Sequence, residues 1–94
     1  MGETLVTSIT PAAGELCVLL FGGVRDVVGA SSLTISIAGP MSAREVLKKI
    51  CDAYPALAPY GPSVRLAVNS TYAAWDDMVS AGDEVAMIPP VAGG

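Results

Sequence analysis

The stretch SAREVLKKICDAY, residues 42–54, decides the fold, because it is the one long amphipathic helix that this chain of 94 residues predicts. Its apolar face is formed by Val46, Leu47, Ile50, Cys51 and Tyr54. Ser42 and Glu45 have the spacing of a capping box, in which each side chain accepts a hydrogen bond from the backbone N–H of the other. Pro55 restricts the residue before it and ends the element. A helix over residues 42–54 extends about 20 Å, enough to lie across one face of a small sheet.

Short segments with strand patterns lie on both sides of this helix. Residues 16–21 form an unbroken apolar run, as expected of a central strand that is buried on both faces. Residues 33–37 and 64–68 alternate apolar and polar side chains, which is typical of strands with one exposed face. A short strand is predicted over residues 71–75, and a last one over residues 84–88, where two prolines stop it.

This order of elements predicts an α+β fold of the β-grasp type, a roll with a mixed sheet of about five strands and one main helix. In this arrangement the first and last strands lie side by side in parallel, which suits the two apolar segments. The length is that of one domain. We expect this domain over residues 15–88, after a flexible extension of residues 1–14 and before a tail of residues 89–94.

The composition excludes many catalytic chemistries. The chain has no histidine, which removes the most frequent general base and metal ligand, and Cys17 and Cys51 lack the spacing of a zinc or redox site. No metal site is therefore expected. Both cysteines are expected to be buried thiols, with a disulfide between them left open. A net charge of −4 with five basic residues does not favour a nucleic-acid partner.

No segment has the length of a membrane span or the charges of a signal peptide. The longest apolar run is residues 16–21, and no basic residue precedes Arg25. We therefore expect no membrane partner and a cytoplasmic location.

The charged residues near turns offer little chemistry of their own. The carboxylates of the C-terminal half flank turns and are expected to be solvated; they are Asp76, Asp77, Asp83 and Glu84. Arg25 and Asp26 are expected to form a local ion pair of small energy. Gly22 and Gly23 belong to no phosphate-binding loop, so a partner would have to bind any ATP that takes part.

The chain ends in two glycines, Gly93 and Gly94, behind Pro89 and Pro90. Glycine has no Cβ, so such an end fits a slot too narrow for other residues. The α-carboxylate of Gly94 is ionised at neutral pH and is able to attack the α-phosphate of a nucleotide held by a partner. The six residues from Pro89 reach at most about 20 Å. Taken alone, a terminal Gly-Gly is also compatible with a frayed end.

The whole C-terminal stretch, GDEVAMIPPVAGG at residues 82–94, resembles the ending of the small, sulfur-carrying subunit of molybdopterin synthase, a family of ubiquitin-like β-grasp proteins. The run VLLF at residues 18–21, with Val24, Arg25, Asp26 and Gly29, is similar to the first strand of that family and the turn that follows it. The segment AVN at residues 67–69 is similar as well. The resemblance extends from about Leu16 to Gly94.

The resemblance implies a function that depends on partners. An E1-like activating enzyme would use MgATP to adenylate the Gly94 carboxylate, and a sulfur donor would then displace AMP and leave a thiocarboxylate. The large synthase subunit, in a heterotetramer, would transfer this sulfur to cyclic pyranopterin monophosphate during molybdenum cofactor biosynthesis. This chain would bind no cofactor and would act as a non-catalytic, sulfur-donating subunit of a transferase complex.

The resemblance also implies where partners bind. A hydrophobic patch beside the tail docks the family's partners, and the matching residues are Phe21, Tyr72 and Ile88. The residues that would thread into the partner's active site ahead of Gly94 are Pro89, Pro90, Val91, Ala92 and Gly93.

Other functions remain open from the sequence. A sulfur carrier for thiamine synthesis or tRNA thiolation also ends in Gly-Gly, and so does a ubiquitin-like modifier that forms isopeptides with lysines. A plain interaction domain with an inert tail is a further alternative. The proline pair after the last strand favours the molybdopterin pathway.

Overall fold

The computed structural model describes residues 14–89, so the extension over residues 1–13 and the tail from Pro90 to Gly94 lie outside the described residues. The division of the chain into extension, domain and tail therefore stays a prediction. The elements follow the order β1 (Glu15–Leu20), α1 (Gly22–Val28), β2 (Ser32–Ser36), β3 (Met41–Ser42), α2 (Ala43–Ala53), the 3-10 helix η1 (Pro55–Ser63), β4 (Arg65–Val68), β5 (Thr71–Tyr72), β6 (Met78–Val79) and β7 (Glu84–Ile88).

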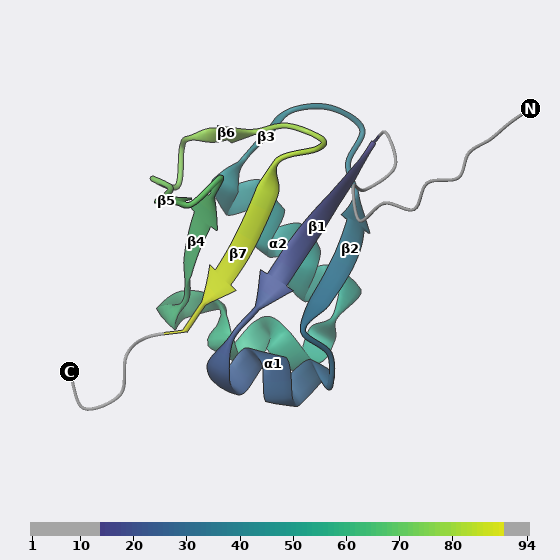
Figure 1. The fold of residues 1–94 in the computed structure, drawn as a ribbon, viewed down its shortest axis with the longest axis vertical. Helices are drawn as coiled ribbons and strands as arrows, with labels where there is room; N and C mark the ends of the chain where they lie inside the picture. The colour runs from purple at the N-terminus through teal and green to yellow at the C-terminus, as the bar shows by residue number, and fades with distance from the viewer. Residues whose placement is uncertain (1–13, 90–94) are drawn as a thin grey trace, which may run out of the picture.

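Five strands form one mixed sheet in the order β2-β1-β7-β4-β5. The first and last strands, β1 and β7, lie side by side in parallel, whereas the other neighbours are antiparallel. Helix α2 lies across one face of this sheet, and Figure 1 shows it behind the strands. The predicted α+β, ubiquitin-like β-grasp fold, with about five strands and one main helix, is confirmed.

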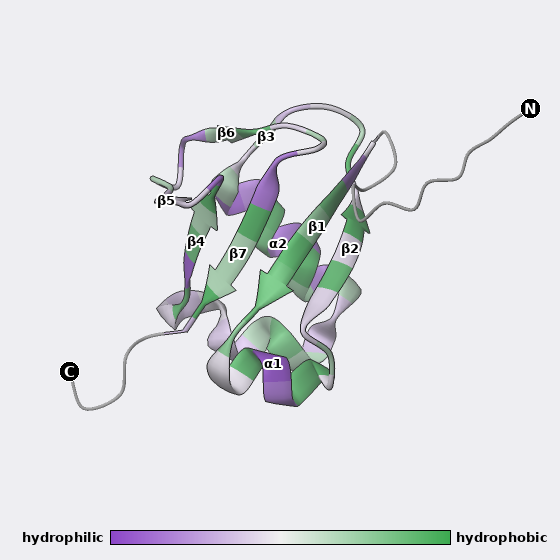
Figure 2. Cartoon of the chain, in the orientation of Figure 1, coloured by the Kyte–Doolittle hydropathy of each residue, from purple (hydrophilic) through white to green (hydrophobic). Residues whose placement is uncertain are grey.

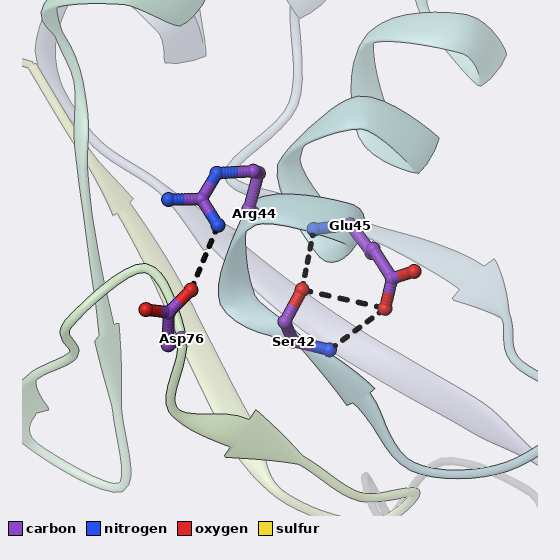
Figure 3. A network of polar contacts seen from close by, with 4 residues as sticks. All are labelled: Ser42, Arg44, Glu45 and Asp76. Carbon is purple, nitrogen blue, oxygen red and sulfur yellow. Dashed lines mark hydrogen bonds and ion pairs between the residues drawn. The ribbon is translucent and has the colours of Figure 1, made fainter.

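Helix α2 begins where the sequence predicts. The backbone N–H of Glu45 donates to Ser42 Oγ at 3.2 Å, and the backbone N–H of Ser42 donates to Glu45 Oε1 at 3.0 Å, so the capping box is complete (Figure 3). The next two unpaired N–H groups, those of Ala43 and Arg44, donate to the carbonyl oxygens of Asp77 and Trp75. The start of the helix is thereby attached to the segment between β5 and β6.

Residues 22–28 form helix α1, where the sequence predicts only a short helical turn or loop. The helix begins with two glycines, a pair that in the sequence indicates only the end of a strand. Gly22 has φ 57°, and this conformation turns the chain from β1 into the helix. The expected ion pair between Arg25 and Asp26 is not formed within the described residues. Adjacent residues on a helix do not face each other, so the prediction was wrong for a geometric reason.

The core lies between α2 and the inner face of the sheet. Every second residue of β1 contributes to it, namely Leu16, Val18 and Leu20, which are almost fully buried. The prediction that residues 16–21 form a strand buried on both faces is wrong, because Cys17 and Leu19 point to the outer face and are half-buried. Within residues 14–89, no helix covers that outer face.

The two cysteines differ from the prediction as well. Both thiols are free, and neither is fully buried. Cys17 shares the outer face with Leu19, and Cys51 lies on the edge of α2, where its sulfur is 3.7 Å from the position of a Cβ added to Gly61. Partial burial, with a smaller effect of the adjacent Asp52, raises the pKa of the Cys51 thiol.

Candidate functional site

The three residues predicted to form a docking patch meet at one hollow. Phe21, Tyr72 and Ile88 line a depression of about 370 Å³ on the outer face of the sheet, which we call the docking hollow. Its other lining residues are Leu19, Ala67, Ser70, Glu84 and Ala86. The grouping is confirmed as geometry, whereas the role of these residues in binding stays a prediction.

Strand alternation explains why these side chains share a face. On β7, Val85 and Met87 point into the core, so Glu84, Ala86 and Ile88 point outward. On the neighbouring strands the register sets Leu19 beside Ala86 and Ala67 on its other side. The hollow is therefore a direct product of the parallel β1–β7 pair and the antiparallel β4–β7 pair.

Two large aromatic side chains at the hollow are strongly exposed to solvent. Phe21 is 46% exposed and Tyr72 is 57% exposed, although the core of the same molecule is almost completely buried. Apolar side chains gathered in an exposed depression mark a binding surface more often than a stabilising feature. The outer face thus has the exposed apolar character that is typical of protein-binding surfaces.

Gly22 lies directly against Pro89, the first residue of the tail, and the sequence reasoning missed this contact. A Cβ added to Gly22 would lie 3.0 Å from Cγ of Pro89, the residue that follows β7. Together with the positive φ of Gly22, this contact leaves room only for glycine. The turn after β1 and the first residue of the tail are therefore packed together beside Phe21.

The polar end of the hollow is held by Asn69. Its backbone N–H donates to the carbonyl oxygen of Glu84 at 2.8 Å, and the N–H of Glu84 donates to Asn69 Oδ1 at 2.9 Å. Asn69 Nδ2 also donates to Asp83 Oδ1 at 3.2 Å. Asn69 adopts φ 51°, a conformation that asparagine tolerates better than most residues. These bonds fix the start of β7 against the turn between β4 and β5.

The acidic residues near the turns are more than solvated charges. Asp83 accepts the N–H of Ser80 at 2.8 Å, and Asp77 accepts the N–H of Ala74 at 2.9 Å. Asp76 accepts from Arg44 Nη1 at 2.8 Å (Figure 3), although both side chains are largely exposed. The prediction that these carboxylates flank turns and are solvated is confirmed for Asp76 and Asp77, which are exposed, whereas Asp83 is half-buried. The hydrogen bonds that all three accept, which close turns or pair with the helix, were not predicted.

The described residues contain no cluster of three or more Cys, Asp or Glu side chains placed to hold a metal ion. Nor, in that part of the chain, is any helix both long enough and apolar enough to cross a membrane.

The mixed five-stranded sheet, the single main helix across one face and the hollow on the other define a ubiquitin-like β-grasp protein. The chain belongs to the ThiS family, whose model matches residues 18–94. The family resemblance noted in the sequence is thereby confirmed.

Two relatives of this chain have different descriptions, one as a sulfur carrier subunit and one as a protein modifier. The molybdopterin synthase sulfur carrier subunit of Arabidopsis thaliana is 31% identical over 91 residues, which cover 97% of this chain and 95% of the relative. Small archaeal modifier protein 1 of Haloferax volcanii is 29% identical over 83 residues, which cover 80% of this chain and 95% of the relative.

Solved structures show the same fold. The crystal structure of SAMP1 from Haloferax volcanii superposes with a TM-score of 0.75 at 28% identity, covering 86% of this chain and all of that chain. A complex of subunits 1 and 2 of the molybdopterin-converting factor from Helicobacter pylori 26695 contains a chain that matches with a TM-score of 0.60 at 20% identity, covering 85% of this chain and 99% of that chain.

Proposed function

We propose that this protein is the sulfur carrier subunit of molybdopterin synthase, with Gly94 as the residue that carries sulfur. The observation that supports this most is the position of the C-terminal motif. The stretch GDEVAMIPPVAGG begins at the turn before β7 and continues into a tail that starts beside the docking hollow. A relative named as a molybdopterin synthase sulfur carrier subunit matches 97% of this chain.

The proposed chemistry occurs at the terminal carboxylate. The Gly94 carboxylate attacks the α-phosphate of ATP in an E1-like activating enzyme, and pyrophosphate leaves. A sulfur donor then attacks the acyl adenylate and displaces AMP, which leaves a thiocarboxylate. This soft, anionic sulfur is the nucleophile that is passed to cyclic pyranopterin monophosphate. MgATP is bound by the activating partner, and the residues that catalyse transfer belong to the large synthase subunit.

The geometry of the domain suits a tethered reagent. Pro89 lies at the end of β7, and the five residues beyond it reach at most about 18 Å when extended. The tail therefore reaches into a partner's active site only if the folded domain docks close to its entrance. The docking hollow, with Phe21, Tyr72 and Ile88, is the surface that we assign to this contact.

The partners follow from the same mechanism. A related fold is solved in a complex of subunits 1 and 2 of a molybdopterin-converting factor, which supports a large synthase subunit as the partner of this chain. The activating enzyme and the sulfur donor are further expected partners, and the cytoplasm is the expected location.

The proposal predicts that molybdopterin formation requires a free Gly94. A variant that lacks Gly94, and a variant with one alanine added after it, should both fold normally and fail to support molybdopterin formation in a reconstituted synthase. A matched control that replaces Met1 with a short affinity tag changes the other end of the chain and should keep full activity. Activity of the extended variant, with its added residue still present by mass analysis, would contradict the proposal.

A second candidate is a ubiquitin-like protein modifier, which the similarity to small archaeal modifier protein 1 favours. In that case Gly94 forms isopeptides with lysines of other proteins, and conjugates of increased mass appear in cells. Carriers for thiamine synthesis or tRNA thiolation use the same loaded tail and differ in the acceptor. Reconstitution with each acceptor system separates these alternatives.

A further inference from the structure

Two oppositely charged side chains flank the docking hollow. Glu84 begins β7 and lines one end of the hollow, whereas Arg65 begins β4, which runs antiparallel to β7. Arg65 is therefore in register with Ile88, at the end of β7 where the chain continues to Pro89. In Figure 2 the hydrophilic colour accordingly appears at the start of β7 and at the start of β4, towards opposite ends of the sheet.

Neither charge is neutralised by an ion pair within residues 14–89. The ion pairs found there both involve side chains of α2. Arg65 instead lies over the ring of Tyr72, with its guanidinium carbon 4.6 Å from the ring centroid. A guanidinium that stacks through its face keeps N–H donors at its edge, where a carboxylate binds with two hydrogen bonds. Arg65 is thus a cation held in place beside an apolar surface.

The two charged residues lie at different ends of the hollow. Glu84 and Ile88 are four residues apart on β7, and a strand rises about 3.3 Å per residue, so the backbone positions of Arg65 and Glu84 lie roughly 13 Å apart along the sheet. The outer face therefore has a cation beside the tail and an anion at the far end, with apolar side chains between them.

We propose that the protein that receives the tail places a carboxylate against Arg65, at the entrance of its tail-binding slot, and a basic side chain against Glu84. This inference rests on the proposed function, because it specifies the chemistry of the same docking partner. A partner laid along β7 in the opposite direction would bring like charges together at both ends, which is strongly unfavourable. Arg65 and Glu84 thus determine specificity by setting the orientation of the partner, and the tail then points into its slot.

A second copy of this chain would also satisfy the charges. In a two-fold dimer, Arg65 of one copy would face Glu84 of the other. The structure favours the tail-receiving partner, because the cation lies at the point where the chain leaves the sheet and enters the tail. Contact between two copies would not require a cation next to the start of the tail.

Charge reversal tests the proposal. The dissociation constant for the large molybdopterin synthase subunit of the same organism is measured for the full-length chain, for Arg65→Glu and for Lys49→Glu. Lys49 lies on α2, across the sheet from the hollow, and its substitution changes the net charge by the same amount. We expect Arg65→Glu to weaken binding at least about tenfold at low salt, with a smaller difference at high salt, and Lys49→Glu to change it less than about twofold.

The outcomes distinguish this inference from the function on which it rests. If the full-length chain binds and Arg65→Glu binds equally well, or loses no more affinity than Lys49→Glu, the inference is overturned and the carrier function stands. If the unmodified chain does not bind the large subunit at all, this result contradicts both the inference and the proposed carrier function. A full-length chain that sediments as a dimer and becomes monomeric as Arg65→Glu would assign the face to a second copy and also overturn the inference. Thermal unfolding of each variant verifies that the exposed substitutions leave the fold intact.

Discussion

At the scale of single residues, two positions without reactive groups control the surroundings of the docking hollow. Gly22 leaves space for Pro89, and Asn69 bonds to Glu84 at the opposite end. Neither role follows from the sequence, because each depends on a contact between segments that are far apart along the chain. Phe21, Tyr72 and Ile88 were identified from a family motif, and the structure brings them together. The sequence gives no reason to single out Arg65, and only the structure shows that its guanidinium lies over the ring of Tyr72.

Substitution of Gly22 by alanine should destabilise the domain and displace the tail. The new Cβ would crowd Pro89 and hold a side chain at positive φ, so we expect a loss of about 1–2 kcal/mol in the free energy of unfolding, measured with urea. Gly23→Ala is the matched control. Its Cβ would meet only Tyr60, at an ordinary distance of 4.0 Å, and alanine favours the helix there, so stability should be unchanged or slightly higher. Equal stability of the two variants would contradict this account.

At the scale of elements, the sequence predicts what has a sustained pattern. The apolar period and capping box located α2, and alternation or continuous apolar runs located β1, β2, β4 and β7. Strands β3 and β6 have two residues each, too few to show a period. The prolines of η1 indicate a loop, yet they accommodate a 3-10 helix. The apolar run of β1 was wrongly predicted to be fully buried, because the outward-facing Cys17 and Leu19 are as apolar as the core residues between them.

The capping box of α2 should contribute measurably to stability. Ser42→Ala removes the oxygen that accepts the Glu45 N–H, and we expect a loss of about 1 kcal/mol in the free energy of unfolding. Ser42→Asp keeps an accepting oxygen and should lose much less. The nearby pair of Arg44 and Asp76 is exposed and should contribute at most about 1 kcal/mol. Urea unfolding of both Ser42 variants checks the prediction, and an unchanged Ser42→Ala midpoint would contradict it.

At the scale of the whole molecule, the two faces of the sheet differ in what they contact. The inner face and α2 form the core, and the outer face presents an apolar hollow with a charge at each end beside the start of the tail. In the proposed function, the folded domain is the recognition element and the tail is the chemical element. Such a division would allow a chain without histidine to take part in a covalent reaction, because the reactive group would be the terminal carboxylate.

The most direct test of this account is the intact mass of the full-length protein after incubation with its activating enzyme, MgATP and a sulfur donor. The account predicts the mass change of one oxygen-to-sulfur exchange, located at Gly94 by fragmentation. The change should be absent when ATP is omitted or when Gly94 is deleted. An unchanged mass with an activating enzyme that loads another sulfur carrier of the same organism, or sulfur found at Cys17 or Cys51 in place of Gly94, would contradict the central claim.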